Sequence, residues 1–188
     1  MDNLQQAYNG LGAWSSPHDF RCRVNALNDQ VNNHSYFTKP FKSLREAWVL
    51  AEFARLISAE SVRLDLVENS DADGYVKISS ECHSVQITGA DREGREICAE
   101  YKPGPSYRVV THEAINDVDD VAKALATAIE TKIEKRYSTR PMLVVDLNLG
   151  VHGPEDEELK LRSRIVALKE QHARHVDGIY VLHQGQLV

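Results

Sequence analysis

The chain has 188 residues, enough for one domain with a buried core, and its 42% hydrophobic and 27% charged content is typical of a globular protein. No apolar run approaches the ~20 residues of a membrane span, and the first residues lack a secretory signal, so we expect a cytoplasmic protein. The net charge of −6 argues against strong non-specific nucleic-acid binding over the whole surface, but it does not exclude a local basic strip.

Residues 1–40 are rich in Asn, Gln, Ser and His and contain few periodic apolar positions. This composition predicts an irregular N-terminal arm, which Trp14, Phe20 and Val24 could dock on the core. Pro40 marks the change to a domain over residues 41–188. We expect the arm to make fewer buried contacts than the rest of the chain and to be available for packing on a partner chain in a homo-oligomer.

The first part of the domain predicts one helix and three strands. A capping-box spacing of Ser43 and Glu46 precedes apolar positions around a helix over residues 43–58. Alternating or short apolar runs then predict the strands, with an Asp-rich turn between the first two. These strands are expected at residues 62–68, 75–79 and 83–88.

The second part of the chain predicts further helices and strands in alternation. Helices are expected at residues 118–136 and 155–173, and the first has an acidic start and a basic end that suit the helix dipole. The continuous apolar run at 142–147 predicts a buried central strand, and 178–183 predicts the last strand. A further short strand is expected around 95–101. The order predicts an α/β protein with a mixed central β-sheet flanked by helices.

Polar residues gather at the second and third predicted strands, in the stretch "DADGYVKISSECHSVQITGAD". Asp71 and Asp73 precede the second strand, and the period of two places Ser84, Gln86 and Thr88 on one face of the third. An Asp-rich solvated turn with an ordinary polar strand face explains this pattern. The alternative is a metal site at the edge of the sheet.

The order of elements, with Asp73 before the second strand and Gln-Ile-Thr on the third, resembles the PD-(D/E)XK nuclease-like superfamily over about residues 43–182. The resemblance implies a restriction-endonuclease-like αβββαβ core. In that family an acid on the first helix, an Asp at the second strand and an (Asp/Glu)-x-Lys on the third strand meet at one sheet edge. The carboxylates hold Mg²⁺, and the lysine activates the water that attacks a phosphodiester.

Carried over by position, the resemblance implies that Asp73 is the motif aspartate and that Gln86 stands in place of the second carboxylate. Asp73 and Gln86 are therefore the predicted ligands of Mg²⁺, with Mn²⁺ as a substitute. Thr88 stands in place of the lysine, and Glu46, with Glu52 second, fits the helix acid. An amide is a neutral ligand, so metal affinity is expected to fall, and a threonine cannot supply an ammonium.

Lysines and arginines elsewhere in the chain offer other positive charges. Strand parity places Lys77 on the face of Asp73, so we hypothesise that Lys77 supplies the missing ammonium. A basic cluster at a predicted helix end and the following turn is either helix-end electrostatics or a nucleic-acid-binding strip. The cluster consists of Lys132, Lys135, Arg136 and Arg140.

Two functions follow from these patterns. The first is a metal-dependent nuclease acting on DNA or RNA, and the second is a catalytically inactive member of the same fold that acts as a binding or interaction protein. The candidate acids have structural alternatives, because Glu46 is also the capping partner of Ser43 and Glu52 can pair with Arg55. No Gly-rich phosphate loop follows a strand, so nothing predicts a nucleotide-cofactor enzyme.

Overall fold

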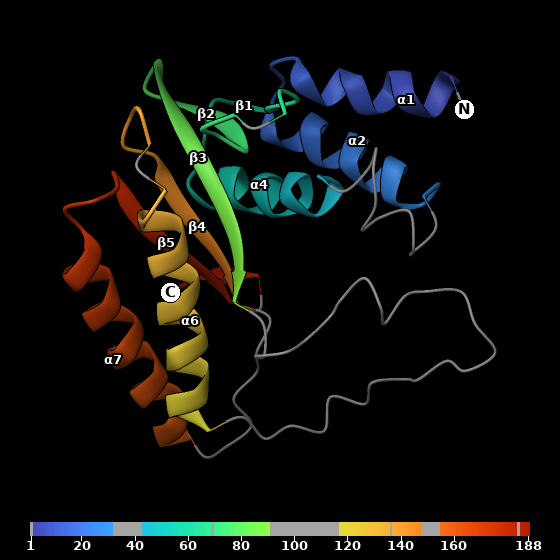
Figure 1. Cartoon of the computed structure of the whole chain (residues 1–188). Helices are drawn as coiled ribbons and strands as arrows, with labels where there is room; N and C mark the ends of the chain where they lie inside the picture. Colours follow the sequence, from blue (N-terminus) through green and yellow to red (C-terminus); the bar gives the residue numbers. More distant parts are fainter. Residues whose placement is uncertain are drawn as a thin grey trace.

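The computed structural model describes residues 2–31, 43–68, 70–90, 117–135, 137–147, 155–183 and 185–188 (Figure 1). The strand expected around 95–101 and the boundary expected at Pro40 lie outside these ranges. No helix in the described ranges has both the length and the apolar character needed to cross a bilayer.

In the described ranges, six strands form one mixed sheet, in the order β1-β2-β3-β4-β5-β6. β2 is antiparallel to β1 and β3, β4 is parallel to both β3 and β5, and β6 closes the sheet as an antiparallel edge. The mixed sheet confirms the predicted α/β class, and its five longer strands lie where the sequence predicted them. The strands are β1 (Ser61–Leu64), β2 (Gly74–Ile78), β3 (Glu81–Ala90), β4 (Met142–Leu147), β5 (Gly178–His183) and β6 (Gln186–Leu187).

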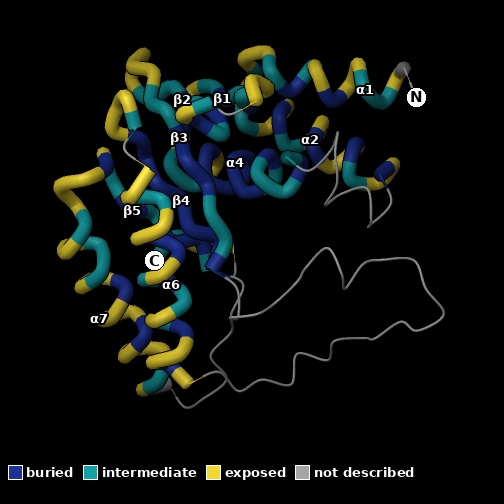
Figure 2. The backbone as a smooth tube through the Cα atoms, viewed as in Figure 1, coloured by how far each residue is buried: buried dark blue, intermediate teal, exposed yellow. Residues whose placement is uncertain are grey.

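Helices cover both faces of the sheet. α4 (Leu44–Leu56) packs on one face, and α6 (Val118–Ile133) and α7 (Glu155–His172) lie on the other (Figure 1). Between these layers β4 is buried along its whole length, as its continuous apolar run predicted (Figure 2). The alternation of side chains along the strands therefore builds one hydrophobic core beneath α4 and a second beneath α6 and α7.

The N-terminal region also belongs to the packed structure. It forms α1 (Asp2–Asn9), the short helix η1 (Gly10–Gly12) and α2 (Pro17–Asn28). Ser16 caps α2 by accepting a hydrogen bond from the backbone N–H of Asp19, and Pro17 occupies the first turn, where it costs no hydrogen bond.

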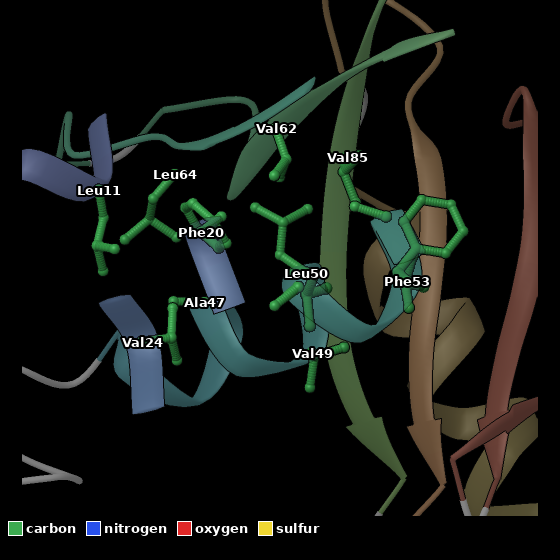
Figure 3. Packing of buried hydrophobic residues seen from close by; sticks show 14 of the residues in the cluster. Leu11, Phe20, Val24, Ala47, Val49, Leu50, Phe53, Val62, Leu64 and Val85 are labelled. Atoms are coloured by element: carbon green, nitrogen blue, oxygen red, sulfur yellow. The ribbon is translucent and has the colours of Figure 1, made fainter. Parts of the chain in front are cut away.

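The prediction of an irregular arm with few buried contacts is wrong for residues 2–28. Phe20, Val24 and Leu27 follow one side of α2 and are buried in the same core as α4 and the sheet. Figure 3 shows Phe20 and Val24 in this core. Trp14, by contrast, stays 37% exposed. Polar residues of the described part, such as Asn25, lie on the exposed side of α2, and three apolar positions at helical spacing dock this helix.

Candidate functional site

A cavity of about 680 Å³ opens where the start of β2, the middle of β3 and the end of α6 face α1 and the first turn of α4. Segments far apart in the sequence contribute to it, including the N-terminal helix that the sequence placed in an arm. Its polar lining includes Tyr8, Glu46, Asp73, Gln86, Lys132 and Tyr137. A hollow in which several polar groups converge is a candidate binding site.

Asp73 and Gln86 lie together in this cavity because of the register of β2 and β3. Gly74 pairs with Val85 across the antiparallel ladder, so the preceding residue, Asp73, lies opposite Gln86. The Oδ2 atom of Asp73 accepts a hydrogen bond from the backbone N–H of Ile87 at 2.7 Å. The Nε2 atom of Gln86, which is only 3% exposed, donates to the carbonyl of Asp71 at 2.7 Å. Both side chains are therefore held in defined positions.

Lys132 reaches both of these residues from the last turn of α6. Its Nζ atom lies 2.7 Å from Oε1 of Gln86 and 3.3 Å from Oδ2 of Asp73. The lysine side chain is only 14% exposed, so water screens this interaction less than it would an exposed ion pair. An ammonium group therefore lies between the two residues that the sequence predicted as metal ligands.

The turn after α6 closes one side of the cavity. The hydroxyl of Tyr137 donates to Oε1 of Gln86 at 3.4 Å. Burial, together with the negative charges of Asp73 and Asp71, raises the pKa of Tyr137 to about 12, so this hydroxyl keeps its proton at neutral pH. Ser138 donates to Oδ2 of Asp71 through both its hydroxyl, at 2.6 Å, and its backbone N–H, at 3.2 Å. These hydrogen bonds lower the pKa of Asp71 and tie the turn to the loop before β2.

Glu46 lines the cavity from the first turn of α4, opposite the strands. Burial raises the pKa of the neighbouring Tyr8, and the carboxylate of Glu46 raises it further against the opposing effect of a hydrogen bond with Ser43. The side chain of Ser43 does not cap α4, so the predicted capping box is not formed. Of the two residues predicted as the helix acid, Glu46 therefore lines the cavity.

Glu52, the second candidate for the helix acid, lies elsewhere. It is 4% exposed and makes ion pairs with Arg21, at 3.0 Å, and with Arg55, at 3.2 Å. Glu52 does not line the cavity, and its contact with α2 gives it a structural role. Its position almost two helical turns beyond Glu46 explains the difference, because the cavity meets only the first turn of α4.

The hypothesis that Lys77 supplies the ammonium is wrong. Its Nζ atom lies 4.7 Å from the centre of the Trp14 ring. Lys77 does share a face with Asp73, but four residues along a strand correspond to about 13 Å, which places the two far apart. Thr88 likewise shares the face of Gln86 without lining the cavity. An even spacing along a strand places two side chains on the same face of the sheet, but it does not bring them close together.

The predicted basic strip divides into residues with different environments. Lys132 lies at the centre of the site, Lys135 lines the cavity, and Arg136 lies outside the described residues. Arg140 instead donates to the carbonyls of Ala173 and Val176, where the chain leaves α7 and approaches β5. These hydrogen bonds give Arg140 a structural role between α7 and β5, and its place in a nucleic-acid-binding strip stays a prediction.

Replacing Arg140 with alanine should destabilise the protein by about 1 kcal/mol without weakening nucleic-acid binding, because it removes hydrogen bonds to the segment between α7 and β5. Urea denaturation and an oligonucleotide-binding assay would measure the two effects. The control Arg162→Ala removes an exposed pair with Glu158 and should change stability by no more than about 0.5 kcal/mol. A loss of nucleic-acid affinity at unchanged stability would return Arg140 to the binding strip.

The site contains oxygen atoms of the kind that Mg²⁺ prefers. Asp73, Gln86 and Glu46 offer the oxygen ligands that hard cations prefer. Within the described ranges, no group of three or more His, Cys, Asp and Glu side chains could hold a metal ion. The ammonium of Lys132 contacts the same oxygens of Asp73 and Gln86. A metal ion at this position would therefore have to compete with Lys132 for these oxygen atoms.

Fold and site together define a mixed α/β protein with a carboxylate, an amide and an ammonium converging on one cavity. Comparison with models of known protein families, with curated proteins and with solved structures found no match to the chain. Conclusions about function therefore rest on the site itself.

Proposed function

We propose that the protein is a metal-dependent nuclease-like enzyme that hydrolyses nucleic-acid phosphodiesters, with Lys132 in the role of the motif lysine. The observation that carries this proposal is the position of the Lys132 ammonium between Asp73 and Gln86. The resemblance to PD-(D/E)XK nucleases leaves one essential group unassigned, and Lys132 supplies it from α6. The order α4, β1, β2, β3, α6, β4 also agrees with the αβββαβ core that the resemblance implies.

The residues of the site would divide the chemistry as follows. Asp73 and Gln86 would hold Mg²⁺, which when bound polarises a phosphoryl oxygen and acidifies a water molecule. Lys132 would donate to a non-bridging phosphate oxygen and stabilise the negative charge that develops as water attacks phosphorus. Tyr137 would keep the Gln86 amide oriented through its hydroxyl. Glu46 would accept a hydrogen bond from the attacking water on the opposite wall of the cavity.

A second candidate is a catalytically inactive protein that uses the same cavity for binding. It is favoured by the hydrogen bonds of Gln86, whose Nε2 donates to Asp71 and whose Oε1 accepts from Lys132. Asp73 also accepts from the backbone N–H of Ile87, so the polar cluster satisfies much of its own hydrogen-bonding capacity. In this case Lys132 neutralises Asp73 and stabilises the fold, and no metal ion is required.

Calorimetric titration with Mn²⁺ separates the two candidates. We expect modest affinity in the wild-type protein and affinity at least about tenfold higher in Gln86→Glu, because a hard cation gains an opposite charge at close range. Asp73→Ala should abolish both metal binding and cleavage of an oligonucleotide. Gln171→Glu adds the same charge on the exposed side of α7 and serves as the matched control, which should behave as wild type.

The Mn²⁺ titration can also exclude the metal-dependent nuclease. If neither the wild-type protein nor Gln86→Glu binds Mn²⁺ at millimolar concentration, the metal-dependent nuclease is excluded. The inactive binding protein then remains as the function that the cavity supports.

A further inference from the structure

Aromatic and cationic side chains form a row across the sheet edge next to the cavity. Arg63 of β1 lies opposite Tyr75 of β2, and its guanidinium carbon is 4.4 Å from the centre of the Tyr75 ring. Ser15 forms a bridge with Val62, which brings the neighbouring Trp14 to the edge of β1. Trp14 receives two cations, with Arg63 at 5.3 Å and Lys77 at 4.7 Å from its ring centre.

This row lies on the face of the sheet that carries the candidate site. Along β1 and β2 the buried Val62 and Val76 point to the core beneath α4, so Arg63 and Tyr75 point to the opposite face. Tyr75 follows Asp73 by two residues and therefore shares its face. The hydroxyl of Tyr75 donates at 3.2 Å to Asp65, which lines the cavity. The row is thus directly connected to the cavity.

The cations in the row have hydrogen-bond donors that a further ligand could use. A guanidinium that stacks on an aromatic ring does so through the flat face of the guanidinium. The N–H donors of the guanidinium point outward in its own plane. The Nε atom of Arg63 is itself buried, so only the terminal nitrogens of this guanidinium are offered to a phosphate. Trp14 is 37% exposed, so part of its ring surface is open to solvent. The nearby Asp65 is engaged by Ser70 and Tyr75 and does not pair with these cations by any observed contact.

We propose that this row, which we call the Trp14 platform (Trp14, Arg63, Tyr75 and Lys77), binds single-stranded nucleic acid beside the cavity. Arg63 and Lys77 would contact phosphates, and Trp14 would stack on an unpaired base. Exposed aromatic rings interleaved with cations bind single strands because every base offers a π-face once it is unpaired. This inference deepens the proposed function by naming its substrate class, and it rests on that function for the step that follows binding.

Fluorescence of Trp14 provides a direct test that does not depend on cleavage. The chain has two tryptophans, so Trp48→Phe leaves Trp14 as the single emitter. In the presence of a chelator, a single-stranded oligothymidylate should quench this emission, whereas a duplex with oligoadenylate should not. Trp14→Ala should weaken binding of a labelled oligothymidylate roughly ten- to a hundredfold. Lys77→Gln and Arg63→Gln should each lower the salt dependence of binding by about 0.7 in log–log slope.

The controls separate this proposal from the proposed enzyme activity. Lys160→Gln removes an exposed lysine of α7 and should leave affinity and salt dependence unchanged. Thermal unfolding of each variant identifies any loss that is due to folding, and the solvent-facing Lys77→Gln should remain folded. Quenching that persists in an Asp73→Ala variant without cleavage supports the platform even if the catalytic proposal fails. Absence of quenching, equal quenching by duplex, or wild-type affinity in Trp14→Ala and Lys77→Gln would overturn it.

Discussion

Lys132→Met is expected to reduce cleavage by at least about a hundredfold and, at the same time, to strengthen the binding of Mn²⁺. Cleavage falls because the ammonium that would stabilise the developing charge on the phosphate is lost. Metal affinity rises because Lys132 contacts Asp73 and Gln86, the oxygen donors that a metal ion would use. Methionine keeps most of the packing of the lysine stem without its charge. A nuclease assay and a calorimetric titration on the same preparation would measure the two effects.

Opposite changes in binding and activity distinguish this mechanism from simple damage to the site. Lys160→Met changes the same side chain on the exposed surface of α7 and should alter neither quantity. Lys132→Arg keeps the positive charge and should retain part of the activity. If Lys132→Met cleaves at the wild-type rate, or binds Mn²⁺ more weakly than wild type, Lys132 is not the ammonium of a nuclease site.

Phe20→Ala is expected to destabilise the whole domain by about 3–5 kcal/mol. Phe20 is fully buried in the core that α2 shares with α4 and the sheet, so its removal leaves a cavity there (Figure 3). Chemical denaturation followed by far-ultraviolet circular dichroism should show a single transition displaced to lower denaturant. The same substitution should lower the fraction of molecules in which the cavity is formed, because α1 contributes Tyr8 to the cavity.

Asn25→Ala is the matched control, because Asn25 lies on the exposed side of the same helix. Its effect on stability should be within about 0.5 kcal/mol. A separate arm would behave differently, since Phe20→Ala would then leave the main transition of the sheet unchanged. That result would restore the division of the chain at Pro40.

The sequence by itself determined the elements of the sheet and their buried faces. The uninterrupted apolar run at 142–147 predicts a strand covered on both sides, and β4 is buried throughout. The spacing of Asp73 and Gln86 was equally informative, because a short hairpin connects β2 and β3 and allows little freedom of register. Local periodicity and short connections carry this information within the chain itself.

Only the tertiary structure decided which lysine contacts Asp73 and Gln86. Lys77 has the correct parity but lies too far along β2, whereas Lys132 is distant in sequence and contacts both Asp73 and Gln86. The position of Lys132 depends on how α6 packs over β3 and β4 through buried residues such as Leu125 and Ile129. The docking of α2 through Phe20 depends in the same way on packing between distant segments. Sequence periodicity identifies the face of an element, but long-range packing sets its position along the neighbouring element.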